Sequence, residues 1–292
     1  MEHRDAARES FAPPIVLSYR EVAPLLRARA AGESRVLVSP DLGLSQVDVT
    51  IDADGARFPG GALLRWDDAD EIAGEETKCF ALRGDQIAAI SFFSETTHWV
   101  RTLYPTGGAP TMLVSGISMH RIKGIDPWQD TLRKVRAIAP MTGRVLDTAT
   151  GLGYTAIEAA KTATEVVTVE VDPAGIEVAR LNPWSRELFT NPRIRLIIGD
   201  VAEVVESFAP ESFSRIIHDP PMFTMAGDLY GGAFYRQLYR VLKPNGRLFH
   251  YIGDLESASN RTILPGVLRR LKEAGFRRVA RRQDAFGLVC QK

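Results

Sequence analysis

The feature that most constrains this chain is a regular alternation of apolar runs and amphipathic segments in its C-terminal half. Four runs are apolar almost throughout, and helix-like segments separate RVLDTAT, VVTVEVD, IRLIIGD and RIIHDPP. Strands that are apolar on both sides and are joined by amphipathic helices form a parallel sheet covered on both faces. The sequence therefore predicts a doubly wound, mostly parallel α/β sheet.

The end of the chain predicts one exception to the parallel order. The last two apolar runs, FRRVARR and FGLVCQK, are separated only by Gln283–Ala285. So short a connection joins neighbouring antiparallel strands, whereas a parallel pair needs a long crossover. We therefore expect a C-terminal hairpin whose final strand runs antiparallel to the sheet.

The first 120 residues have a different texture. The spacing of Ser18 and Glu21 in SYRE predicts a capping box at the start of a helix that Gly32 closes. From there to Met119, short β-rich runs alternate with turn sequences such as DADG and PTGG. We predict a helix plus a small β-rich domain in residues 1–120, followed by a catalytic domain in residues 121–292.

Composition excludes several kinds of protein. The chain has 292 residues, a formal net charge of +0 and two cysteines. No global field recruits nucleic acid or a membrane. The charged start MEHRDAARES lacks the apolar core of a signal peptide, and no window reaches the roughly 18 apolar residues of a membrane span. We expect a cytoplasmic enzyme with no membrane partner and no metal site, in which Cys79 and Cys290 are buried small hydrophobic residues.

Acidic side chains stand at or next to the end of each of the four apolar runs. They are Asp147, Glu170, Asp200 and Asp219. In a doubly wound sheet, ligands bind at the carboxyl ends of the strands, near the point where the strand order reverses. An acid at Glu170 can accept both hydroxyl groups of a ribose in charge-assisted hydrogen bonds.

The glycine turn GLGYTA follows the first run. By itself it permits a nicotinamide or flavin dinucleotide, as in an oxidoreductase. Four nearby carboxylates would repel a pyrophosphate, but they would attract a ligand with an ammonium group and a sulfonium group. The combination therefore favours a sulfonium donor over a dinucleotide.

Residues 126–292 resemble the class I S-adenosylmethionine-dependent methyltransferases, which implies S-adenosyl-L-methionine as cofactor and a seven-stranded, Rossmann-like sheet. The resemblance implies that Asp147 and residues 148–153 hold the methionine part, Glu170 the ribose, and Asp200 with the backbone of Val201 the adenine. The full set of implied cofactor residues is Asp147, Thr148, Ala149, Thr150, Gly151, Gly153, Tyr154, Glu170, Val171, Asp200, Val201 and Asp219.

The fourth run ends in HDPPMF, which resembles the (Asp/Asn)-Pro-Pro-aromatic motif of enzymes that methylate exocyclic amines of bases and the amide of glutamine. A base amine is a poor nucleophile, because its lone pair is delocalised. Asp219 would accept one N–H and the carbonyl of Pro220 the other, while Pro221 stiffens the turn. Phe223 would stack on a flat acceptor, although Met222 separates it from the prolines. His218 would take the released proton, or would instead pack at the strand end.

A wider resemblance covers most of the chain, including HRIKGIDPWQDTLRK and AGDLYGGAFYRQLYRVLKPNGRLFHYIG. It is to a predicted, mainly archaeal methyltransferase family that reads DPPRF where this chain reads DPPMF. The resemblance implies an N-methyltransferase in RNA modification, with N4 of a ribosomal RNA cytidine as the acceptor. Two alternatives stay open, namely a methyl or aminopropyl transferase acting on a small molecule or polyamine, and a non-catalytic cofactor-binding module.

Other features bear on partners. Residues 269–282 hold seven basic residues and one acidic residue, which suits either an RNA backbone or a solvated helix and edge strand. The β-rich part suits either a substrate platform or a homodimer surface. The motif at Asn182, Pro183 and Trp184 would wall the cofactor pocket or break a helix. Segments before the first strand often form a lid over the cofactor, and the residues expected there are His120, Arg121 and Asp130.

Overall fold

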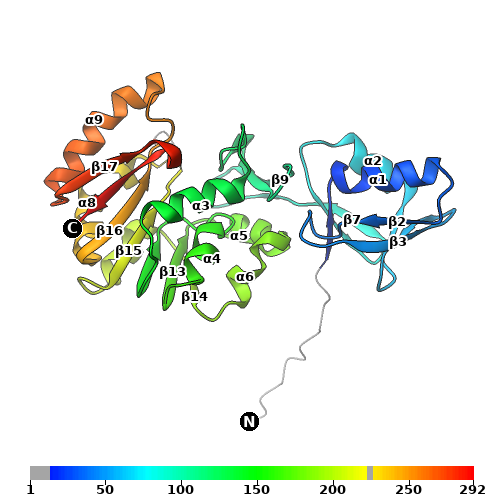
Figure 1. Cartoon of the computed structure of the whole chain (residues 1–292), viewed down its shortest axis with the longest axis horizontal. Helices are drawn as coiled ribbons and strands as arrows, with labels where there is room; N and C mark the ends of the chain where they lie inside the picture. Colours follow the sequence, from blue (N-terminus) through cyan, green and yellow to red (C-terminus); the bar gives the residue numbers. More distant parts are fainter. Residues whose placement is uncertain (1–13, 222–225) are drawn as a thin grey trace, which may run out of the picture. The chain divides into compact units, whose positions relative to one another are not determined.

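The computed structural model describes residues 14–221 and 226–292, and the chain divides into two compact units (Figure 1). The N-terminal unit ends at Ile90 and the C-terminal unit runs from Ser91 to Lys292. The sequence predicts a boundary at residue 120, whereas the structure assigns residues 91–120 to the C-terminal unit. The reason is a small sheet that packs on that unit, described below.

The described part of the N-terminal unit contains α1 (Tyr19–Ala30), α2 (Trp66–Gly74) and two small antiparallel sheets with strand orders β1-β6-β7 and β2-β3-β4-β5. The predicted capping box at the start of α1 is confirmed, since the backbone N–H of Ser18 donates to Glu21 Oε2 at 2.9 Å. The strands are β1 (Ile15–Leu17), β2 (Arg35–Val38), β3 (Val47–Ile51), β4 (Gly55–Arg57), β5 (Leu63–Arg65), β6 (Phe80–Arg83) and β7 (Gln86–Ala89). The two helices and the two sheets bury a core of their own.

A third antiparallel sheet, of order β11-β10-β9-β8, opens the C-terminal unit. Its strands are β8 (Ser91–Phe93), β9 (Val100–Tyr104), β10 (Thr111–Val114) and β11 (Ile117–Ser118). A buried ion pair ties it to the start of α5 (Pro173–Leu181), because Arg101 Nε donates to Asp172 Oδ2 at 2.6 Å. Ser94 Oγ donates to the other oxygen of Asp172 at 2.8 Å. These contacts make the sheet part of the C-terminal unit.

The large sheet has seven strands in the order β14-β13-β12-β15-β16-β18-β17. Within the described sheet, β18 runs opposite to the other six strands, so the predicted C-terminal hairpin is confirmed. The strands are β12 (Arg144–Asp147), β13 (Glu165–Glu170), β14 (Ile194–Ile198), β15 (Phe213–His218), β16 (Leu242–Tyr251), β17 (Arg278–Arg282) and β18 (Gly287–Gln291).

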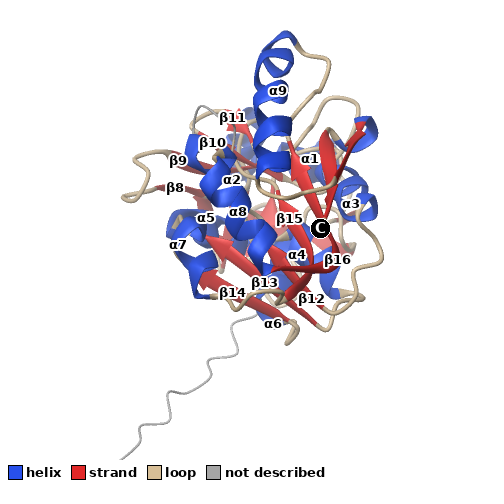
Figure 2. Ribbon diagram, turned by 90° about the vertical axis from the view of Figure 1, so that its left-hand side faces the viewer, coloured by secondary structure: helices blue, strands red, loops and turns tan. Residues whose placement is uncertain are grey.

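Helices cover both faces of this sheet (Figures 1 and 2). One face carries α7 (Val201–Val204), α8 (Gly232–Val241) and α9 (Ala258–Glu273); the other carries α3 (Pro127–Ala137), α4 (Tyr154–Ala160), α5 and α6 (Arg186–Thr190). Ile216 of β15 faces the first set, and Ile217 faces the second. Both side chains are fully buried. Burial on two faces is the physical reason why these strands are unbroken apolar runs.

The strand order places a crevice at the centre of the sheet. From β12 the chain moves outward to β13 and β14, and then returns to β15 on the other side of β12. The loop after β12 is fixed to both neighbours, because Thr148 N donates to Ile217 O at 3.0 Å and Thr150 N donates to Val169 O at 2.9 Å. The carboxyl ends of β12 and β15 therefore flank the position at which doubly wound sheets bind ligands.

Within residues 14–221 and 226–292, no helix is both long enough and apolar enough to cross a membrane.

Candidate active site

Asp147, the last residue of β12, is a fully buried carboxylate at this crevice. Its Oδ2 accepts hydrogen bonds from Thr155 Oγ1 at 2.8 Å and Thr168 Oγ1 at 3.2 Å. Its Oδ1 has no hydrogen-bond partner among the described residues. Burial raises the pKa of Asp147 to about 7. A buried acceptor oxygen without a partner is costly unless a ligand completes it.

The glycine turn adopts a backbone that side chains disfavour. Gly151 and Gly153 have φ values of 53° and 77°. A Cβ on Gly153 would come within 2.8 Å of the side chain of Leu188, and a Cβ on Gly151 within 2.5 Å of Met119 Cε. The turn is tight as well as left-handed, which explains why this sequence uses glycine at both positions.

Glu170, at the end of β13, is joined directly to the glycine turn. Its Oε2 accepts the N–H of Gly151 at 2.9 Å, and its Oε1 accepts the N–H of Asp172 at 3.0 Å. Burial raises the pKa of Glu170. The structure thus brings the loop after β12 and the acid of β13 together, as the sequence predicts for a cofactor site.

The third predicted acid lies beside them. Gly199 N donates to Glu170 O at 2.8 Å, which places the following Asp200 next to the end of β13. The exposed side chain of Asp200 caps α7 by accepting the N–H of Ala202 at 2.8 Å. Val171 is 47% exposed and Val201 is buried. An exposed valine beside the crevice is a surface on which a flat ring can pack.

This donor set fits S-adenosylmethionine. Asp147 Oδ1 is a carboxylate oxygen that an ammonium group would satisfy. Each oxygen of Glu170 accepts one backbone N–H and keeps a lone pair for a ribose hydroxyl. The residues would therefore hold the amino-acid end and the ribose of the ligand from neighbouring strands.

Asp219 follows β15, on the other side of the crevice, and it is part of an ion-pair chain. Lys134 Nζ lies 2.6 Å from Asp219 Oδ2 and 2.9 Å from Asp130 Oδ2. Arg121 completes the chain with an ion pair to Asp130 Oδ1. The side chain of Asp219 is 20% exposed and that of Lys134 is 1% exposed. Asp219 is therefore the solvent-facing end of a buried row of alternating charges.

Lys134 is a member of this ion-pair chain that the sequence does not indicate. It lies on α3, one turn after Asp130, and reaches a carboxylate 85 positions further along the chain. A lysine on an amphipathic helix normally faces solvent. Its spacing of four residues from Asp130 indicates an ordinary surface pair, so no local pattern marks it as part of a site.

The proline motif is described only in part, since Met222 and Phe223 lie outside the described residues. Pro220 is buried, and its carbonyl accepts no hydrogen bond within the described part of the chain. The carbonyl of Pro221 accepts the Tyr230 hydroxyl at 3.0 Å. The turn after Asp219 is thus held from η3 (Gly227–Tyr230), and the stacking role predicted for Phe223 stays a prediction.

His218 lies beneath the site, with both ring nitrogens engaged. Nδ1 is 2.7 Å from the hydroxyl of Thr148, and Nε2 is 3.0 Å from the carbonyl of Leu229. The ring is completely buried, and burial lowers the pKa of His218 to about 3. The imidazole ring is neutral and each of its nitrogens already has a hydrogen-bond partner. This favours the packing role of His218 over the proton-accepting role that the sequence also allows.

Two further predicted residues, His120 and Asn182, contact Tyr154, the residue that follows the glycine turn. His120 stacks on Tyr154 with the ring centroids 5.3 Å apart, and burial lowers its pKa to about 3. Asn182 Nδ2 donates to the hydroxyl of Tyr154 at 2.9 Å and to Ser185 Oγ at 2.7 Å. Asn182 is buried and also caps the short turn η1 (Pro183–Ser185). The helix break is therefore a packed element under the glycine turn.

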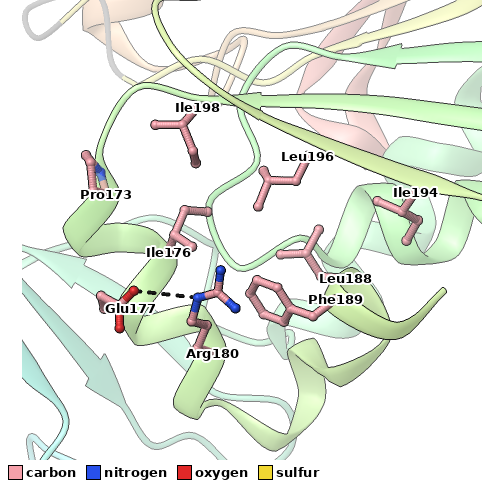
Figure 3. Close-up of a pocket in the computed structure, with 9 residues that line it drawn as sticks. All are labelled: Pro173, Ile176, Glu177, Arg180, Leu188, Phe189, Ile194, Leu196 and Ile198. Carbon is pink, nitrogen blue, oxygen red and sulfur yellow. Dashed lines mark ion pairs between the residues drawn. The ribbon is translucent and has the colours of Figure 1, made fainter. Parts of the chain in front are cut away.

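A separate groove of about 520 Å³ lies over the edge strand β14, between α5 and α6 (Figure 3). Its floor is apolar, and at its rim Arg180 lies 3.5 Å from Glu177 and packs on Phe189. None of the predicted site residues lines this groove. The candidate active site is the crevice between β12 and β15.

Several basic residues of segment 269–282 have hydrogen-bond or ion-pair partners within the protein. Arg270 Nε donates to the carbonyl of Tyr230 at 2.8 Å, and Arg282 pairs with Asp284 at 3.2 Å. Arg269 lies 3.8 Å from Glu273. These contacts suit a solvated helix and edge strand.

Comparisons with known proteins show what the C-terminal unit is similar to. A family model described as a methyltransferase domain matches residues 145–246. The uncharacterized protein MJ1233 of Methanocaldococcus jannaschii is 42% identical over 241 residues, which are 81% of this chain and 81% of that protein. A polyamine aminopropyltransferase of Mycobacterium tuberculosis is 30% identical over 118 residues, 38% of this chain and 22% of the enzyme. Putrescine N-methyltransferase 2 of Nicotiana tabacum is 30% identical over 111 residues, 37% of this chain and 31% of the enzyme. The chain thus spans less than a third of the length of these two enzymes.

Among solved structures, a spermidine synthase in complex with the transition state analogue AdoDATO is similar in fold. The TM-score is 0.57 at 23% sequence identity, over 69% of this chain and 71% of that chain. The strand order, the acids at the strand ends and the family model lead to one conclusion. The chain belongs to the family of MJ1233, and its C-terminal unit carries an S-adenosylmethionine-dependent methyltransferase domain.

Proposed function

We propose that the protein is an N-methyltransferase that uses S-adenosylmethionine to methylate an amine of a small aliphatic molecule, a diamine or polyamine. The observation that carries this proposal is Asp219, a partly exposed carboxylate two residues beyond Ile217, which pairs in register with Asp147. Its Oδ1 makes no hydrogen bond within the described part of the chain. The sequence similarity to a putrescine N-methyltransferase and to polyamine aminopropyltransferases supports an aliphatic amine as acceptor.

On the donor side, the chain supplies charge and shape. When bound, S-adenosylmethionine supplies an electrophilic methyl group on a sulfonium. Asp147 and Glu170 bind and orient the donor, and the rigid loop between them needs no reordering, because neighbouring strands already hold its amides. Asp147 must release its proton to pair with an ammonium group, since burial holds its pKa near 7.

On the acceptor side, Asp219 and Pro220 offer oxygens to the N–H groups of the incoming amine. Two fixed acceptors orient the nitrogen lone pair toward the donor side. Proline at both following positions removes backbone N–H groups that would otherwise compete for the carboxylate. Methyl transfer is preferred over aminopropyl transfer because the family model is that of a methyltransferase domain.

The alternative acceptor, N4 of a ribosomal RNA cytidine, follows from the proline motif and from the wider family resemblance, and it has no support among these relatives. A chain of zero net charge lacks a general attraction for RNA, and basic residues 270 and 282 have partners within the chain. The experiment therefore includes RNA among the acceptors, so that methylation of RNA would be detected.

The test is incubation with methyl-labelled S-adenosylmethionine and separate acceptors: putrescine, spermidine, spermine, ribosomal RNA and transfer RNA. We expect label in at least one amine, and Asp219→Asn should reduce the rate by about 10²-fold or more. S-adenosylhomocysteine affinity of this variant should stay within a few-fold of wild type in calorimetry. Label only in RNA would contradict the proposed acceptor. Product formation only from decarboxylated S-adenosylmethionine would identify aminopropyl transfer instead.

A further inference from the structure

We propose that Lys134 is a positioning residue which, through Asp219, keeps the acceptor amine in its neutral, nucleophilic form. This inference rests on the proposed function and assigns a role to a residue in the same site. Its basis is the buried ion-pair chain of Arg121, Asp130, Lys134 and Asp219.

Lys134 binds one of the two carboxylate oxygens of Asp219. The Nζ of Lys134 is 2.6 Å from Asp219 Oδ2, which leaves Oδ1 as the oxygen for the acceptor. The same Nζ is 2.9 Å from Asp130 Oδ2 and 4.5 Å from the ring centroid of Tyr251. With carboxylates on two sides and an aromatic face on a third, the lysine side chain has one position. It therefore orients the Asp219 carboxylate as well as balancing its charge.

The charge matters because only a neutral amine can attack. In the transfer, the nitrogen lone pair forms the new N–C bond, the electron pair of the broken S–C bond stays on sulfur, and the nitrogen then releases a proton to solvent. An isolated carboxylate would hold an aliphatic amine as its ammonium ion, which has no lone pair. A carboxylate already paired with a buried ammonium stabilises a second cation much less. Asp219 then accepts an N–H without favouring protonation of the nucleophile.

Most of the groups around the pair keep one charge state near neutral pH, and the exception is Asp147, whose pKa burial raises to about 7. The attraction of two carboxylates raises the pKa of Lys134, so it stays cationic. Burial raises the pKa of Tyr251 to about 12, and burial also raises the pKa of Tyr230. The titratable and charged groups that act on Lys134 and Asp219 from the neighbouring elements are His120, Arg121, Asp130, Asp147, Tyr230 and Tyr251. Removing Lys134 and removing Asp130 change the net charge of this ion-pair chain in opposite directions.

The experiment uses this opposition of sign in the full-length protein. Lys134→Met leaves the ion-pair chain with one excess negative charge, whereas Asp130→Asn leaves the ion-pair chain with one excess positive charge. The quantity to measure is kcat for the preferred amine as a function of pH, and its acid limb is the range in which kcat falls as the pH is lowered. We expect the midpoint of the acid limb to shift to a pH about one unit higher in Lys134→Met and about one unit lower in Asp130→Asn. At pH 7 the kcat of Lys134→Met should fall by about tenfold, with KM unchanged or lower, because the variant binds the ammonium ion well.

Lys161→Met is the matched control, because it removes the same charge away from the site. Lys161 directly follows α4 and pairs with Glu158 of that helix. This variant should leave the acid limb unmoved. Limbs that stay at the wild-type pH in both site variants, or that move in the same direction, would overturn the role of Lys134. If Lys134→Met does not fold, Asp130→Asn decides alone: a downward shift supports the role and an unmoved limb overturns it. Wild-type protein that binds S-adenosylhomocysteine but methylates no amine would instead overturn the proposed function, and this role with it.

Discussion

Asp147 shows how one buried carboxylate makes cofactor binding depend on pH. Its pKa near 7 means that about half of the ligand-free protein carries a proton there at neutral pH. An ammonium ligand pairs only with the ionised form, so binding must release that proton. We expect the affinity for S-adenosylhomocysteine to rise by up to about tenfold per pH unit from pH 5 to 7, and to level off above pH 8. Calorimetry at several pH values measures this directly.

The ligand 5′-methylthioadenosine is the control for this prediction, because it lacks the ammonium group and should bind with little pH dependence. Asp147→Asn should flatten the profile for S-adenosylhomocysteine. An unchanged slope in Asp147→Asn would assign the pH dependence to another group. Stability shifts in the opposite sense to affinity: the folded pKa of Asp147 lies above its unfolded value of 3.8, so its contribution to stability is present at acidic pH and is lost as pH rises through 7.

At the scale of elements, the turn between β12 and α4 depends on two separate properties of Gly153. Its φ of 77° costs a side chain about 1–2 kcal/mol, and an added Cβ would also press against Leu188 at 2.8 Å. Gly153→Ala should therefore destabilise the protein by about 2–3 kcal/mol in urea unfolding and weaken S-adenosylhomocysteine binding.

Gly116 provides the matched control for this element. Its φ is 87°, but a Cβ there would meet nothing within 4 Å. Gly116→Ala should cost only the conformational part, about 1–2 kcal/mol. Equal losses in the two variants would mean that α6 moves aside and that the contact with Leu188 carries no energy.

At the scale of the whole molecule, the two units have separate cores, and every described residue of the candidate site lies in the C-terminal unit. We expect a fragment of residues 91–292 to fold and to bind S-adenosylhomocysteine within about threefold of the full chain. A fragment starting at residue 121 should be much less stable, because it loses the sheet β8–β11 and leaves Asp172 without Arg101 and Ser94. Circular dichroism and calorimetry on both fragments make the comparison. A stable fragment from residue 121 would restore the boundary expected from the sequence.

Local patterns predicted much of the fold and which acids meet on the donor side of the candidate site. The period of the apolar runs, the short link before the last strand and the capping box at Ser18 are properties of neighbouring residues, and the structure confirms each of them. The donor side was predictable because Asp147 and Glu170 end adjacent parallel strands, and the carboxyl ends of parallel strands meet at one edge. The boundary at residue 120 was harder, because residues 91–118 have the same β-rich texture as the strands before them. Contacts between distant parts of the chain, such as those of Arg101 and Ser94 with Asp172, assign them to the second unit.

The sequence by itself determined the class of the fold and the positions of the predicted donor-site acids and of the Asp219 carboxylate, since each depends on where a strand ends. The tertiary structure alone decided how that carboxylate is held. Lys134 and Asp219 are far apart in the chain and meet because α3 packs across the sheet beside β15 and β16. Charge pairing across such a distance has no local pattern, because the energy of a buried pair depends on geometry and on exclusion of water, and these arise only when the layers pack.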